Sequence, residues 1–207
     1  MPVSIRKYTE LKLSISDYLQ RRNWARLFEL CGTSDEETAK TIAVIMSFYS
    51  PRKIWSFLDY VFSLSAEERR GKRDAVGTVC YILGKIGQTS TERSLNYLRR
   101  FLLEDHMLRW QVTAAVSNLW VLDTKTTSKI ILNKWVLRNE DNDDLTDVGI
   151  RSSEYLAKNA PERVSPFLHK IAAMSEERKS ASKTARELIQ LNDVSGRKVA
   201  SRLQKKK

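Results

Sequence analysis

Apolar residues recur at three- and four-residue steps along most of the chain, which is the pattern of helices that bury one face. This periodicity predicts helices over residues 16–31, 35–49, 51–64, 66–86, 91–104, 107–122, 125–139, 144–159, 161–174 and 176–191, and a basic, frayed helix after Gly196. No segment shows the apolar–polar alternation of a half-buried strand, and the 7 glycines and 4 prolines are too few for a turn-rich β protein. The sequence therefore predicts an all-α fold.

Short motifs mark where several of these helices begin and end. The segments Ser34–Glu37 and Ser65–Glu68 fit the capping box, in which serine and glutamate side chains bind free backbone amides at a helix start. Pro51 and Pro161 are placed in a first helical turn, where the missing N–H costs nothing. Two glycines are expected to end helices in the left-handed conformation: Gly32 and Gly87.

An apolar set returns at a nearly constant spacing along the chain. Its markers lie near the ends of alternate helices, at spacings of 37, 36, 37 and 32 residues: Met46, Leu83, Leu119, Leu156 and Leu188. Twelve residues after each marker lie Leu58, Leu95, Ile131, Leu168 and Ala200, and fifteen residues after it lie Val61, Leu98, Lys134 (beside Trp135), Ile171 and Leu203. With connections of a few residues between helices, this period is typical of stacked, antiparallel helix pairs.

Two segments resemble HEAT repeats. Residues 147–168, from Asp147-Val148-Gly149 to Phe167-Leu168, look like one whole unit, and residues 107–119 look like the first helix of another. The likeness covers roughly Thr38 to Leu191 and implies a short α-solenoid of about five helix pairs. We expect a HEAT-like domain over residues 1–191 and a basic C-terminal helix or flexible tail over residues 192–207.

Positive charge is unevenly shared between the two helices of each pair. The chain has a formal net charge of +11; the first helices of the pairs carry +1 in total, whereas the second helices carry +13, or +10 without Lys205, Lys206 and Lys207. In HEAT-like stacks the second helices line the concave surface, so the resemblance implies a basic inner wall. Such a wall favours nucleic acid, DNA or RNA, or an acidic protein as partner.

The residues expected to bind that partner lie beside the apolar set on the second helices: Lys53, Tyr60, Arg93, Tyr97, Arg100, Lys129, Asn133, Lys170, Lys198 and Arg202. The densest group places Tyr97 between two guanidiniums, which could hold phosphate oxygens while the tyrosine stacks or donates its hydroxyl. The alternative is that these long basic side chains only solubilise an exposed face. A protein–protein scaffold with incidental charge is the matching alternative function.

Enzyme and cofactor motifs are sparse. His106 and His169 have no partner at metal-ligand spacing. The acidic run at 140–144 lacks the glycine and glutamate of a calcium loop, since Thr146 and Ser152 occupy those positions. We therefore expect no cofactor or metal, and a binding module rather than an enzyme. The five tryptophans are assigned to the core.

One enzyme family stays open as a second function. Residues 147–188 look broadly similar to the C-terminal part of HEAT-like alkylpurine DNA glycosylases. That resemblance implies an aromatic- and aspartate-lined cleft, for which the nearest candidates are Trp110, Trp120 and Asp123.

Cysteine content and hydropathy bear on location. Cys31 and Cys80 are far apart in the sequence and form no CxxC motif. We therefore expect two free thiols, as is usual in a reducing compartment. No apolar run approaches the roughly 20 residues of a membrane span, and the first residues lack a secretory signal core. A cytoplasmic protein without membrane contact is expected.

Overall fold

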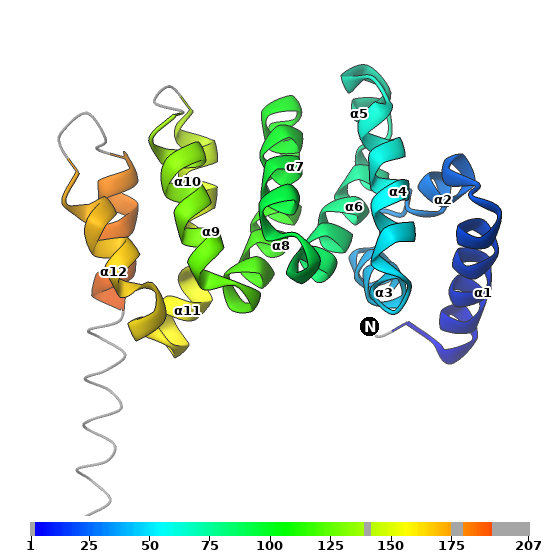
Figure 1. Ribbon diagram of the computed structural model, residues 1–207, viewed down its shortest axis with the longest axis horizontal. Coiled ribbons are helices and arrows are strands. Elements are labelled where there is room, and N and C mark those ends of the chain that lie inside the picture. Colours follow the sequence, from blue (N-terminus) through cyan, green and yellow to red (C-terminus); the bar gives the residue numbers. More distant parts are fainter. Residues whose placement is uncertain (1–2, 139–141, 175–179, 192–207) are drawn as a thin grey trace, which may run out of the picture. The chain divides into compact units, whose positions relative to one another are not determined.

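The computed structural model describes residues 3–138, 142–174 and 180–191, and every regular element in these ranges is helical (Figure 1). The all-α prediction is confirmed. The α-helices are α1 (Ile5–Arg21), α2 (Trp24–Leu30), α3 (Glu36–Ser47), α4 (Pro51–Ser63), α5 (Ala66–Gly71), α6 (Arg73–Ile86), α7 (Thr91–Glu104), α8 (Arg109–Leu122), α9 (Thr124–Ile130), α10 (Asp143–Arg151), α11 (Glu154–Asn159) and α12 (Pro161–Ala172). Residues 180–191 form a further helix, and three short elements complete the set: the 3₁₀ turns η1 (Gly87–Thr89) and η2 (His106–Leu108) and the π-helical η3 (Ile131–Val136).

Four of the predicted helices are interrupted or displaced. The predicted helix 16–31 is α1, which begins much earlier, followed by α2, and residues 66–86 divide at Lys72 into α5 and α6. Residues 125–139 change from α-helix to π-helix at Ile131, and residues 144–159 divide between α10 and α11. Apolar spacing reports which residues are buried. It does not report the local backbone hydrogen bonds that end or change a helix, so it does not predict these breaks.

The predicted caps hold in part. Ser65 and Glu68 form the complete capping box, and Pro51 and Pro161 open α4 and α12. The Ser34 box is wrong, because α3 takes Asp35 as its N-cap, whose carboxylate accepts hydrogen bonds from Thr38 and Lys7 instead.

The prediction that Gly32 and Gly87 adopt the left-handed conformation is also wrong. Gly87 has a φ of −56°, and no described glycine has a positive φ. The left-handed residue among those described is Arg22, with a φ of 53°.

The repeating apolar set lies in the core. The five markers are at most 2% exposed, and the residues twelve positions after the first four of them are fully buried: Leu58, Leu95, Ile131 and Leu168. Val61, Leu98, Trp135 and Ile171 are also fully buried. Ala200 and Leu203 lie outside the described residues. The predicted apolar positions that the structure describes are therefore buried, with Trp135 rather than Lys134 in the core of η3.

The chain divides into two compact units, residues 1–115 and 116–207. In the first unit α3 packs along α6, and α4 meets α7 through Trp55, Phe62 and Tyr97. In the second, α9 packs on α12, and Arg151 on α10 pairs with Glu187 on the helix at 180–191. In each unit, then, helices that are separated by two other α-helices along the chain lie side by side.

Glycine allows close helix contact at one point in the first unit. A Cβ on Gly84 of α6 would lie 2.8 Å from the Ala115 Cα and 3.0 Å from its carbonyl oxygen, on α8. Both Ala115 atoms belong to the backbone of α8 and cannot rotate aside as a side chain would. A larger residue at position 84 would therefore separate the two helices.

Cys31 and Cys80 are buried free thiols, and burial raises the pKa of Cys31 to about 12. Over the ranges the structure describes, no helix combines the length and the apolarity that crossing a bilayer requires.

Candidate functional site

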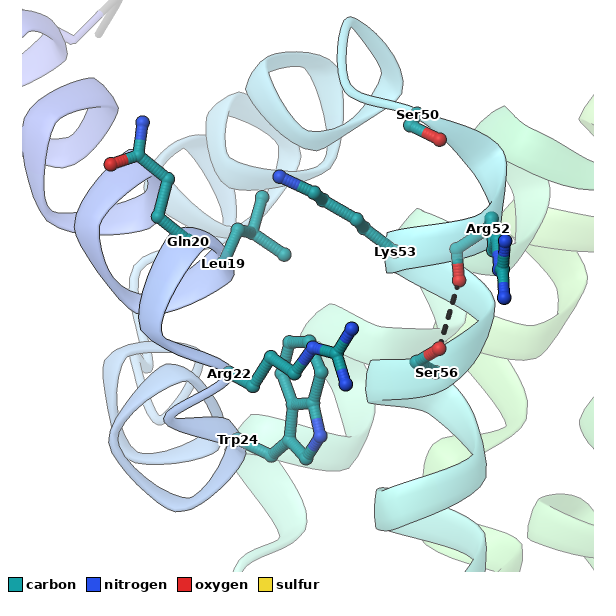
Figure 2. Close-up of a pocket in the computed structure, with 8 residues that line it drawn as sticks. All are labelled: Leu19, Gln20, Arg22, Trp24, Ser50, Arg52, Lys53 and Ser56. Atoms are coloured by element: carbon teal, nitrogen blue, oxygen red, sulfur yellow. Dashed lines mark hydrogen bonds between the residues drawn. The ribbon is translucent and has the colours of Figure 1, made fainter.

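A basic pocket lies in the first unit between the α1–α2 junction and α4 (Figure 2). Its cavity measures about 570 Å³. We call it the Arg22 pocket; its lining residues are Leu19, Gln20, Arg22, Trp24, Ser50, Arg52, Lys53 and Ser56. Three of these side chains are cationic and none is acidic.

The left-handed turn at Arg22 builds one wall of the pocket. Its backbone N–H and that of Asn23 both donate to the Tyr18 carbonyl, which closes α1, and the Asn23 side chain then caps α2 by accepting from the Arg26 amide. Chain direction changes within two residues as a result, and Arg22 and Trp24 face α4. A side chain at this φ costs about 1–2 kcal/mol relative to glycine.

The first turn of α4 builds the opposite wall. Pro51 begins the helix, and its first turn contains no acidic residue. Figure 2 shows Lys53 reaching from α4 toward Leu19 and Gln20, and Arg22 reaching from the α1 end toward α4, with Arg52 at the margin. Two cations thus approach one cavity from opposite sides, and the partial positive charge of a helix start lies on the same side as Lys53.

The carboxylates on the helices around the pocket are occupied elsewhere. The four acidic residues of α1, α2 and α4 each pair with an arginine outside the pocket: Glu10 with Arg6, Asp17 with Arg21, Glu29 with Arg26, and Asp59 with Arg93. Arg22, Arg52 and Lys53 form no ion pair with any described residue. The positive charge of the Arg22 pocket is therefore not neutralised by the part of the protein that is described.

Trp24 supplies an aromatic surface to the same pocket. It is half-buried, and its ring meets the Phe57 ring at 6.4 Å between centroids with a 50° tilt. Its indole N–H makes no hydrogen bond to a described residue. The pocket thus combines positive charge, an aromatic side chain and a free donor.

The structure brings Arg93 and Tyr97 of the predicted binding group together, but both side chains mainly contact other residues of the protein. The Arg93 guanidinium lies 4.4 Å from the Trp55 ring centre and pairs with Asp59, to which the Tyr97 hydroxyl also donates at 2.9 Å. Tyr97 stacks on Phe62 at 3.5 Å between centroids. Burial first, and then acceptance by the charged Asp59, raise the pKa of Tyr97.

Arg100 is likewise paired, through a buried neighbour. Its Nε donates to Glu104 at 2.8 Å, and Glu104 also accepts two hydrogen bonds from Arg69, whose side chain is 2% exposed. Burial by itself raises the pKa of Glu104, but the hydrogen bonds from both arginines outweigh it and hold that pKa below its usual value. The positive charge of Arg69 and Arg100 is therefore largely neutralised by Glu104 within the protein.

The remaining predicted residues are scattered over several elements. Tyr60 is half-buried on α4, Lys129 and Asn133 are exposed on α9 and η3, and Lys170 is exposed on α12. Lys198 and Arg202 lie outside the described residues. Of the predicted residues that the structure describes, Lys53 alone lines the Arg22 pocket.

The residues weighed for a glycosylase cleft have structural roles or stand apart. Trp120 is fully buried, and its indole N–H donates to the Ser152 hydroxyl at 3.0 Å. Asp123 caps α9 by accepting from the Thr126 amide, and Trp110 is 67% exposed. Among the residues that can be described, no three His, Cys, Asp or Glu side chains gather as metal ligands would.

No protein-family model, curated protein or solved structure matches the chain.

Proposed function

We propose that this protein is a HEAT-like α-solenoid that binds nucleic acid without catalysing a reaction. The repeat part of the proposal is supported by contacts between residues about one period apart. Arg93 reaches Asp59 over 34 residues, Tyr97 reaches Asp59 over 38, and Arg151 reaches Glu187 over 36. A stack of equivalent helix pairs places corresponding side chains next to each other in this way.

The nucleic-acid part is carried by the charge imbalance of the Arg22 pocket. Carboxylates on the surrounding helices already have partners, whereas the three cations of the pocket have none among the described residues. Like charges gathered around one cavity repel each other, so an anion there relieves the repulsion. Phosphate binds both guanidinium and ammonium groups, and each phosphate contact releases condensed counterions.

The test removes this charge and keeps a matched control. The pocket variant R22Q/R52Q/K53Q and the control K12Q/K85Q/K183Q each lose three positive charges from exposed side chains, and none of the control residues lines the pocket. Fluorescence anisotropy with labelled oligonucleotides over a salt series gives the slope of log affinity against log salt. The pocket variant should make that negative slope shallower by about 2–3, near one unit per lost phosphate contact. The control should change the slope by clearly less.

Equal slopes in the two variants would contradict the pocket as the binding surface. Absence of binding by the wild type to both single strands and duplexes would refute the function. In that case binding to polyglutamate, followed in the same salt series, tests the acidic protein as the partner.

A further inference from the structure

We propose that the Arg22 pocket takes one unpaired nucleotide of a single-stranded nucleic acid, with its phosphate between Arg22 and Lys53 and its base against Trp24. This inference rests on the proposed function and adds to it the state of the ligand, single-stranded rather than duplex. It follows from the shape and chemistry of the cavity, not from the net charge.

The first observation is the concavity. A duplex presents its phosphates on a convex outer surface and is contacted by side chains that project outward. The cations here instead surround a cavity of about 570 Å³, within the range of about 300–1,000 Å³ typical of pockets that hold small molecules. A cavity of this size can enclose a nucleotide, and an unpaired strand can place one there.

The second observation is the position of Trp24. An aromatic side chain contributes to binding when the face of a base lies on it, and bases inside a duplex have both faces covered by their neighbours. Trp24 lines the cavity together with the cations, and its indole N–H has no described partner. A duplex phosphate alone would leave this ring without a ligand contact, whereas an unpaired nucleotide satisfies the ring and the cations together.

The third observation is the spread of the polar groups. Arg22 and Lys53 extend from opposite walls (Figure 2), and Gln20 and Ser50 also line the cavity. The Gln20 amide both donates and accepts, and the Ser50 hydroxyl is not used to cap α4. These neutral groups can hydrogen-bond to a sugar or a base edge. Because each is both donor and acceptor, they fit any of the bases, and weak sequence preference is expected.

The experiment compares labelled dT12 with a labelled 12-base-pair duplex by fluorescence anisotropy at one salt concentration. Wild type should bind dT12 more tightly. Loss of one stacking contact is worth about 1–3 kcal/mol, so W24A should weaken dT12 binding roughly 5-fold or more and leave duplex binding nearly unchanged. W24F, which keeps a ring, should fall between wild type and W24A.

W110A is the matched control, since Trp110 is exposed and does not line the pocket; it should bind dT12 as wild type does. Equal binding of dT12 and duplex, with no effect of W24A or W24F, would overturn this inference while the proposed function stands. Failure of both oligonucleotides to bind would overturn both. If W24A does not fold, the graded effect of W24F on dT12 relative to duplex decides.

Discussion

Replacement of Arg22 by glycine separates stability from binding at a single residue. Arg22 has a φ of 53° and a ψ of 34°, a conformation that glycine adopts freely and that a side chain disfavours. Its backbone N–H bond to Tyr18 does not need a side chain. The variant R22G should therefore be more stable than a variant that keeps a Cβ, although it lacks a cation of the pocket.

The size of the effect follows from three terms. Relief of the left-handed strain contributes about 1–2 kcal/mol. The greater freedom of glycine in the unfolded chain costs about 0.4–1 kcal/mol, and loss of a cation at the α1 C-terminus costs about 0.3 kcal/mol. R22G should then be more stable than wild type by about 0.5 kcal/mol. R22A loses the same charge but keeps the strain, so R22G should exceed R22A by about 1 kcal/mol.

Urea denaturation of wild type, R22G and R22A measures these differences, and anisotropy with dT12 measures binding. Both variants should bind more weakly than wild type, to a similar extent. If R22G were no more stable than R22A, the left-handed conformation of the turn would be refuted. If R22G were more stable and bound as well as wild type, Arg22 would not contact the ligand.

Two further substitutions test the packing of the first unit. G84A should destabilise by about 1–3 kcal/mol, because its Cβ meets the Ala115 backbone, whereas the control G71A, with nothing within 4 Å, should change stability by less than about 1 kcal/mol. E104Q should destabilise by about 2–3 kcal/mol at pH 7, because it leaves Arg69 buried without its carboxylate. The folded pKa of Glu104 lies below its usual 4.5, so the pair stabilises above that pH and the contribution is lost as pH falls through the folded pKa. Urea denaturation should accordingly show the gap between wild type and E104Q narrowing below pH 4.5.

The core could be predicted from the sequence because burial leaves a periodic trace. The apolar period predicts that Met46 and Leu83 are buried, and both are fully buried in the structure. Ser65, Glu68 and Pro51 are also readable, because their roles depend on neighbours within one turn. Local chemistry and periodicity together predict the helical segments, but not the breaks at Lys72 and Ile131.

The pocket could not be predicted in the same way, because its residues come together through an irregular turn. Arg22 falls inside the predicted helix 16–31, where the sequence predicts no left-handed residue. The sequence predicts Trp24 in the core with the other tryptophans, whereas its ring is half-buried, with one side against Phe57. The one detectable signal was the pair Arg52-Lys53 directly after Pro51, two cations in a first helical turn that usually favours acids.

The contrast between the two basic groups shows why counting charge along a helix does not identify a binding surface. Arg93 and Arg100 stand out in the sequence, yet α4 and α7 bring Asp59 and Glu104 against them. A guanidinium that already has a carboxylate must give up that bond to bind phosphate, so much of the gain is cancelled. Lys53, with no carboxylate partner among the described residues, loses only hydration. The free energy available for an anionic ligand is therefore greater at the Arg22 pocket, whose cations have no carboxylate partner among the described residues, and this difference favours the pocket over the Arg93 side of α7 as the site for the proposed strand.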